Sequence, residues 1–227
     1  MAEKRVIFFD VGNTLLFPNR AKMLAPLPVH RHPTLEQWQA LECRTKAAFD
    51  QSMQSGQVDH GFWWIFHSYL LADLHEAQDE DETQDELLHA LVRNTQKSEN
   101  WDQILPGTRD ALDRIAARFR IAVISNADGK IVKILSRCGI ADCFESITDS
   151  GVVGREKPHP EIFHAALRTM NARASESLYV GDVYSVDYVG ARNVGMAAVL
   201  FDVAGAYRER REPRVESVEQ LESWLGQ

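Results

Sequence analysis

The sequence has only three cysteines, with no C-x-x-C pair among them. An odd and widely spaced set does not form a disulfide framework, so reduced thiols in a cytosolic protein are expected. Long hydrophobic runs are also missing. The most apolar long segment, residues 62–74, is interrupted by His67, Ser68 and Asp73, and a membrane-spanning helix needs ~20 apolar residues. The apolar stretch near the N-terminus, residues 6–9, is too short for a signal peptide. These absences predict a cytoplasmic protein that makes no membrane contact.

Positive charge is in short supply. Lysine and arginine total 25 against 33 aspartates and glutamates, for a formal net charge of −8. Nucleic acids and anionic membranes are bound by clustered basic residues, so neither is an expected partner. A small phosphorylated ligand stays compatible with this balance, because one local site can be positive on an acidic protein. We expect a monomer or a homodimer.

Short apolar runs alternate with helical patterns over most of the chain. Because the runs do not alternate polar with apolar residues, they indicate parallel strands covered on both faces. The predicted strands are 6–9, 121–124, 178–180 and 197–201, and the predicted helices are 108–119, 130–138, 161–170 and 187–193. This order predicts an α/β fold with a doubly wound parallel sheet.

The segment 17–99 shows a different pattern, with no convincing strand. It begins with a proline-rich stretch, and Thr34 and Gln37 then form a T-x-x-Q capping box. Helical patterns follow at 35–53, 61–75 and 83–98. We therefore predict an inserted all-helical cap of residues 17–99 and a core formed by residues 1–16 and 100–227.

Two groups of polar residues in this insert resemble metal ligands at first sight. One is an acidic cluster in residues 79–86, which we interpret as a solvated turn before a helix N-terminus, where negative charge is favourable. The other is the series His60, His67 and His75. Spacings of seven and eight residues put neighbours about two turns, or ~10–12 Å, apart on a helix. A surface stripe is therefore expected rather than a metal site.

Three candidate functional motifs follow predicted strands or lie in a stiff loop. Asp10 directly follows the strand 6–9, at the end where α/β sheets bind ligands, although such an aspartate can also cap a turn. Ser125 and Asn126 follow the strand 121–124 and suit either a phosphate oxygen or a helix N-cap. Lys157 lies in a loop stiffened by prolines and, taken alone, could be a surface lysine.

A fourth motif carries more weight. Asp182 follows the strand 178–180, and Asp187 opens the next helix. Two carboxylates in one crevice repel each other unless a cation is present. This pair therefore favours a site for a divalent metal.

The order of these motifs resembles that of the haloacid dehalogenase superfamily over nearly the whole chain. The resemblance rests on Asp10-x-x-x-Thr14-Leu15, Ile124-Ser125-Asn126, Lys157-Pro158-x-Pro160-Glu161-Ile162-Phe163 and Gly181-Asp182-x₄-Asp187. The helical insert stands where that family has its type 1 cap. Trp63-Trp64 resembles a branch that includes the haloacid dehalogenase-like hydrolase domain-containing proteins of animals.

The resemblance implies a role for each motif residue. Asp10 would be the nucleophile and form an aspartyl-phosphate, while Ser125 and Lys157 would hold the phosphoryl oxygens. The implied substrate-binding residues are Gly12, Asn13, Ser125, Asn126 and Lys157. The implied Mg²⁺ ligands are Asp10, the Gly12 carbonyl and Asp182, with Asp187 in support. A metal ion and a lysine would offset the charge of a carboxylate attacking a dianion.

One position departs from the commonest phosphatase form of the first motif, which is Asp-x-Asp-Gly-Thr. Gly12 replaces the second aspartate, and Asn13 replaces the glycine. That aspartate protonates the leaving group in the family and then activates water, a contribution typically worth ~10²–10⁴-fold. Dehalogenases of the family lack the metal and the aspartate pair, so Asp182 and Asp187 argue against dehalogenation.

The departure leaves alternatives open. His30 or His32 could supply a substitute acid, although a loop histidine is more often only a surface residue. A phosphonate hydrolase with a Schiff-base lysine in the cap is a second alternative, for which the candidates are Lys22, Lys46 and Lys97, with Lys46 the best placed. A non-catalytic, phosphoryl-binding regulatory protein is a third. The favoured interpretation is an Mg²⁺-dependent hydrolase of small phosphorylated metabolites.

Overall fold

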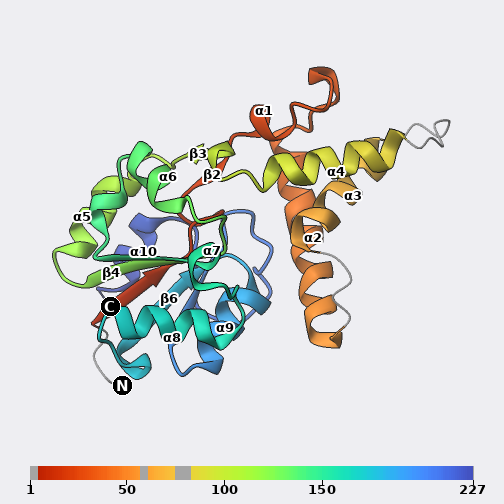
Figure 1. Cartoon of the computed structure of the whole chain (residues 1–227). Coiled ribbons are helices and arrows are strands. Elements are labelled where there is room, and N and C mark those ends of the chain that lie inside the picture. The colour runs from red at the N-terminus through yellow and green to blue at the C-terminus, as the bar shows by residue number, and fades with distance from the viewer. Residues whose placement is uncertain (1–4, 57–60, 75–82, 227) are drawn as a thin grey trace.

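The computed structural model describes residues 5–56, 61–74 and 83–226 (Figure 1). A six-stranded sheet in the order β5-β4-β1-β6-β7-β8 forms its centre. Every neighbouring pair in this sheet is parallel. The strands are β1 (Val6–Phe9), β4 (Arg120–Ser125), β5 (Ser146–Asp149), β6 (Ser177–Gly181), β7 (Ala197–Phe201) and β8 (Arg214–Val215). The predicted doubly wound α/β fold is confirmed.

Helices cover both faces of the sheet (Figure 1). In β1, Ile7 and Phe9 belong to one buried apolar cluster with α5, α6 and α10, and Val6 and Phe8 belong to a second with α8 and α9. The core helices are α5 (Thr108–Ala116), α6 (Ile131–Arg137), α7 (Ser150–Val153), α8 (Pro160–Thr169), α9 (Val189–Asn193) and α10 (Val218–Trp224). Burial on both faces explains why the strands are apolar without alternation.

The predicted elements differ from the observed ones mainly at their ends. Strands 6–9 and 197–201 have the predicted bounds, and β4 and β6 each extend one residue further at both ends. The helix expected at 187–193 begins instead with a π-helical turn, Tyr184–Tyr188, that leads into α9. The edge strands β5 and β8 were not predicted, because short strands of mixed polarity carry little periodic signal.

In the described part of the chain between β1 and α5, four α-helices pack around their own apolar cluster, apart from the sheet (Figure 1). These cap helices are α1 (Arg20–Met23), α2 (Leu35–Ser55), α3 (Phe62–Leu74) and α4 (Thr83–Thr95). The Thr34–Gln37 capping box at the start of α2 is confirmed. An antiparallel ribbon of β2 (Phe17–Pro18) and β3 (Trp101–Gln103) joins them to the sheet domain. We propose that the boundary between the cap (17–99) and the core (1–16 and 100–227) lies in this ribbon.

The histidine interpretations need correction. His67 is fully buried in α3 and bonds Thr95 Oγ1 through Nε2 at 2.7 Å, so it is not part of a surface stripe. Burial lowers its pKa to about 4. His60 and His75 lie outside the described residues, as does most of the acidic cluster, whose Asp85 and Glu86 occupy the first turn of α4. Within the described ranges, no helix is both long and apolar enough to cross a membrane.

Candidate active site

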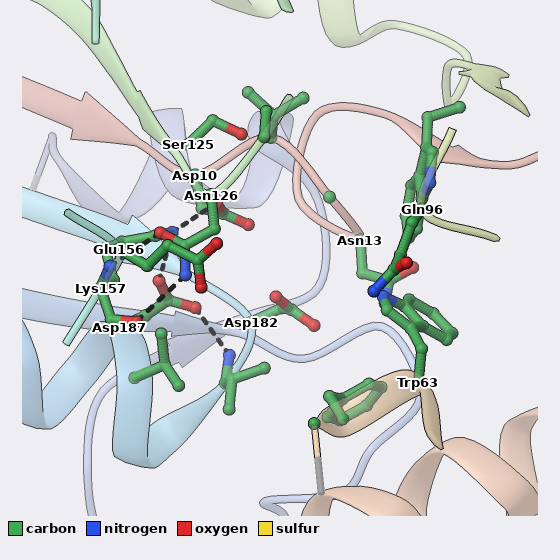
Figure 2. Close-up of a pocket in the computed structure, with 18 of the residues that line it drawn as sticks. Asp10, Asn13, Trp63, Gln96, Ser125, Asn126, Glu156, Lys157, Asp182 and Asp187 are labelled. Atoms are coloured by element: carbon green, nitrogen blue, oxygen red, sulfur yellow. Dashed lines mark hydrogen bonds and ion pairs between the residues drawn. The ribbon is translucent and has the colours of Figure 1, made fainter. Parts of the chain in front are cut away.

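The predicted site residues come from strands that are neighbours in the sheet. β1 lies between β4 and β6, with Phe9 paired to Val123 and to Val180. Asp10, Ser125 and Asp182 therefore meet at one edge of the sheet, and all three side chains are buried (Figure 2). This edge opens into a cavity of about 620 Å³ between the sheet and the cap helices. The topology thus forms a polar site at the carboxyl ends of the strands.

Lys157 lies just before α8 and is buried at this edge. Its Nζ donates to Asp10 Oδ1 at 2.5 Å and to Asp187 Oδ1 at 2.7 Å (Figure 2). Burial by itself lowers the pKa of Lys157, but the two carboxylates outweigh that effect and raise this pKa above its ordinary value. Lys157 is therefore a protonated ammonium group at the nucleophile candidate, rather than a surface lysine.

Tyr179 is a site residue that the sequence analysis missed. It lies within the apolar strand β6, and its hydroxyl is 2.8 Å from Lys157 Nζ. The hydroxyl also donates to Asp187 Oδ1 at 3.1 Å. Burial, reinforced by the nearby Asp187 and Asp10, raises the pKa of Tyr179 well above its ordinary value, so the phenol stays neutral. The only available signal was a hydroxyl inside an otherwise apolar strand.

Three buried carboxylates form a candidate metal centre. One oxygen each from Asp10, Asp182 and Asp187 lies within 4.8 Å of the others. Burial raises the pKa of Asp10 to about 6, where Lys157 opposes the rise and Asp187 adds to it. Burial raises the pKa of Asp182 to about 7, where Lys46 opposes the rise and the other two aspartates add to it. Charged forms of such groups require a cation, and oxygen ligands suit Mg²⁺, so the donor set fits this ion.

Asp187 differs from the other two carboxylates. Its Oδ1 accepts from Lys157 and Tyr179, and its Oδ2 accepts from the Val183 backbone N–H at 2.9 Å. Both of its oxygens therefore hold neighbouring groups in place. We therefore propose that Asp187 supports Asp10 and Asp182 at the candidate metal centre, rather than being a principal ligand.

Lys46 of α2 also reaches this centre from the cap. It is almost completely buried, and its Nζ lies 3.0 Å from Asp182 Oδ2 and 2.9 Å from Glu42 Oε1. Burial by itself lowers the pKa of Lys46, but Asp182 and Glu42 outweigh it and raise this pKa well above its ordinary value. A Schiff-base lysine must be deprotonated to attack a carbonyl. The arrangement therefore disfavours Lys46 in the phosphonate hydrolase alternative.

The other two lysine candidates do not line the cavity. Lys22 forms an ion pair with Asp102, and Lys97 donates to Asn94 Oδ1 at 2.9 Å. His30 and His32 are likewise absent from the cavity wall, and His32 Nε2 is 3.1 Å from the carbonyl oxygens of Leu24 and Leu27. The expectation that either histidine could supply the missing acid is wrong for this arrangement.

A second contact holds α2 to the sheet domain. Buried Asp50 accepts from the Ser185 backbone N–H at 2.9 Å and from the Tyr207 hydroxyl at 3.0 Å. Glu42, Lys46 and Asp50 recur every four residues and so lie on one face of the helix. This spacing was visible in the sequence, but nothing local indicated that the face would be buried against the site.

Asn126 and Asn13 are important for the backbone conformation around the site. The Asn126 amide donates to the Lys157 carbonyl at 3.0 Å and accepts from the Lys157 N–H at 2.7 Å. Asn126 is therefore better suited to positioning Lys157 than to binding substrate. Asn13 has a positive φ of 51°, a conformation that asparagine tolerates better than most residues. This tolerance explains how it can replace the usual glycine.

Gly12 faces the indole ring of Trp101 from β3. A Cβ atom added at Gly12 would lie 3.4 Å from the nearest ring carbon of Trp101. The indole N–H is already donated to the Thr95 carbonyl at 2.8 Å, so it is not available as an acid. The place of the family's second aspartate therefore adjoins an apolar ring.

Comparisons with known proteins identify the family of this chain. Residues 4–195 match the haloacid dehalogenase-like hydrolase family. The human haloacid dehalogenase-like hydrolase domain-containing protein 3 is 31% identical over 208 residues, which cover 86% of this chain and 81% of that protein. The glyceraldehyde 3-phosphate phosphatase of Pyrococcus abyssi is 42% identical over 101 residues, 43% of this chain and 42% of that protein.

A solved structure supports the fold over the full length. The HAD hydrolase YfnB from Bacillus subtilis, in its magnesium-bound form, superposes with a TM-score of 0.71 at 18% identity, covering 99% of this chain and 100% of that one. The family match covers more than half of the sequence, and the strand-end aspartates and buried lysine occur in the expected order. The chain therefore belongs to the haloacid dehalogenase-like hydrolase family.

Proposed function

We propose that this protein is an Mg²⁺-dependent phosphohydrolase that acts through an aspartyl-phosphate on Asp10. The observation that carries the proposal is the buried contact of 2.5 Å between Lys157 Nζ and Asp10 Oδ1, beside the carboxylates of Asp182 and Asp187. A lysine at the nucleophile and a cation site next to it are what a carboxylate attacking a phosphate dianion requires. The names of relatives support it, since one is a glyceraldehyde 3-phosphate phosphatase and a solved neighbour is bound to magnesium.

The chemistry follows from these positions. An Asp10 oxygen would attack phosphorus, forming the aspartyl-phosphate while the bond to the leaving oxygen breaks. Lys157 and Ser125 would hold the phosphoryl oxygens, and Mg²⁺ held by Asp10, Asp182 and the Gly12 carbonyl would offset their negative charge. Water would then attack the phosphorus, releasing phosphate and restoring the Asp10 carboxylate. We propose small phosphorylated metabolites of the cytoplasm as substrates.

The metal site gives a first prediction. Asp182→Ala should weaken Mg²⁺ binding at least about tenfold, because a carboxylate ligand is lost, and Asp182→Asn should weaken it less because one neutral oxygen remains. Isothermal calorimetry with MgCl₂ measures both affinities, and thermal melting verifies the fold. Asp113→Asn on the exposed side of α5 is the matched control. An unchanged Mg²⁺ affinity in Asp182→Ala would refute the assignment.

The experiment that tests the function uses acetyl phosphate, whose good leaving group needs no acid. We expect hydrolysis that requires Mg²⁺ and stops with EDTA. Binding of phosphate without any turnover would instead favour the non-catalytic, regulatory alternative. The buried pairing of Lys157 with Asp10 supports turnover, because ionisable groups buried and paired in a cleft are common at catalytic sites.

A further inference from the structure

The cavity above Asp10 has two chemically different ends. At about 620 Å³ it is far larger than a phosphoryl group needs and has the volume of a small-molecule pocket. Figure 2 shows Lys157 with Asp10 and Asp187 on one side, and Trp63 on the other together with the uncharged side chains of Asn13 and Gln96; Asp182 lies between them. The apolar residues that line the cavity on the cap side are Phe49, Met53, Phe62, Trp63 and Trp101.

The aromatic rings of this wall form a continuous series. Ring centroids are 5.7 Å apart between Phe49 and Phe62, 5.1 Å between Phe62 and Trp63, and 5.3 Å between Trp63 and Trp101. All three pairs meet edge to face, which is a favourable geometry for aromatic contacts. The wall therefore runs without a break from α2 to the ring that faces Gly12.

The direction of the reaction places a leaving group against this wall. In phosphoryl transfer the attacking and leaving oxygens are roughly in line on opposite sides of phosphorus. Asp10 lies at the sheet edge, so a leaving group points away from the sheet and toward the cap helices. The leaving group would therefore contact aromatic rings rather than charged side chains.

The remaining charges on the cavity wall disfavour a second anionic group. Among the described residues that line the cavity, Lys157 is the only lysine or arginine, and it is already paired with Asp10 and Asp187. Asp128 and Glu156 add negative charge near its rim, although Asp128 is also paired with Lys130 outside the cavity. A second phosphate or a carboxylate on the substrate would be repelled here, and the nearby Lys46, which does not line the cavity, is already paired with Asp182 and Glu42.

We propose that the preferred substrates are monophosphate esters of flat, uncharged aromatic alcohols, rather than bisphosphates or phosphorylated acids. This inference rests on the proposed phosphohydrolase function for the identity of the phosphoryl end. The aromatic wall selects the group that leaves.

Binding of non-hydrolysable phosphonates tests the inference without requiring turnover. Calorimetry with Mg²⁺ present would compare benzylphosphonate, naphthylmethylphosphonate and 4-(phosphonomethyl)benzoate on the full chain. We expect the naphthyl compound to bind about tenfold more tightly than benzylphosphonate, as extra apolar contact in a pocket provides. The benzoate should bind several-fold more weakly than benzylphosphonate. Equal affinities, or tighter binding of the benzoate, would overturn the inference.

Met53 allows the wall itself to be altered. It is half-buried, so a new side chain there does not disturb the apolar cluster of the cap. Met53→Lys should reverse the order, so that the benzoate binds more tightly than benzylphosphonate, while Met53→Leu should keep the native order. If Met53→Lys melts like the native protein but still binds benzylphosphonate more tightly than the benzoate, the leaving group lies elsewhere.

The two proposals fail in different ways. If acetyl phosphate is hydrolysed but the phosphonates show no preference for the naphthyl group, only the inference about the substrate is wrong. If the naphthyl preference is present but no phosphate ester or acetyl phosphate is hydrolysed, the aromatic site stands and the catalytic proposal is wrong.

Discussion

Asp10→Asn should abolish turnover, lowering kcat on acetyl phosphate by on the order of 10⁴-fold or more, as the loss of a nucleophile does in other covalent mechanisms. An amide oxygen is a poor nucleophile, and the change also removes negative charge from the candidate metal centre. The fold should persist, because asparagine has nearly the same shape and Lys157 keeps its contacts with Asp187 and Tyr179.

Two measurements check this result. Steady-state kinetics gives the loss of kcat, and mass spectrometry of acid-quenched protein should find a phosphoryl group on Asp10 in the native protein and none in the variant. Asp113 is exposed and forms an ion pair with Arg109. Asp113→Asn therefore serves as the control and should keep native kinetics. More than about one hundredth of native turnover in Asp10→Asn would contradict a nucleophilic role.

The activity of the native protein should fall steeply as the leaving group becomes more basic, because Gly12 supplies no acid. A second carboxylate introduced at position 12 could raise kcat/KM on alkyl phosphates by up to ~10²-fold. Apart from the two residues adjacent to Gly12 in the sequence, the nearest group to a Cβ added there is the indole ring of Trp101, at 3.4 Å, and a carboxylate would extend beyond that Cβ. Gly12→Asp alone should therefore gain little, and Gly12→Asp with Trp101→Leu should gain most.

A series of phosphate esters of graded leaving-group basicity provides the measurement, as kcat/KM for each protein. Gly12→Ala adds only the Cβ, which fits in ordinary contact with the indole, and should leave the steep dependence unchanged. Trp101→Leu alone controls for the lost ring. A shallow dependence in the native protein would mean that another residue already acts as the acid. Glu156, which lines the cavity beside Lys157, would then be the residue to change.

Many of the strands, helices and candidate site residues of this protein can be predicted from local sequence patterns. The strands 6–9 and 197–201 could be located because both faces of each are buried, which leaves an unbroken apolar run. The Thr34–Gln37 capping box marked the start of α2, because it is completed within four residues. The residues Asp10, Ser125 and Asp182 could be chosen as candidates because each stands at or just after the end of such a run.

The contacts between distant segments, by contrast, are decided only by the tertiary structure. Lys157 contacts the hydroxyl of Tyr179, and Lys46 contacts Asp182 from the cap. Asp50 accepts a hydrogen bond from Tyr207, which lies 157 positions further along the sequence. Helical periodicity shows that α2 has a polar face, but not which part of the molecule that face will meet. Trp101 likewise faces Gly12 only because the ribbon of β2 and β3 returns the chain to the sheet at that point. Local propensity sets the elements, whereas the packing of the cap helices on the strand ends determines which side chains complete the site.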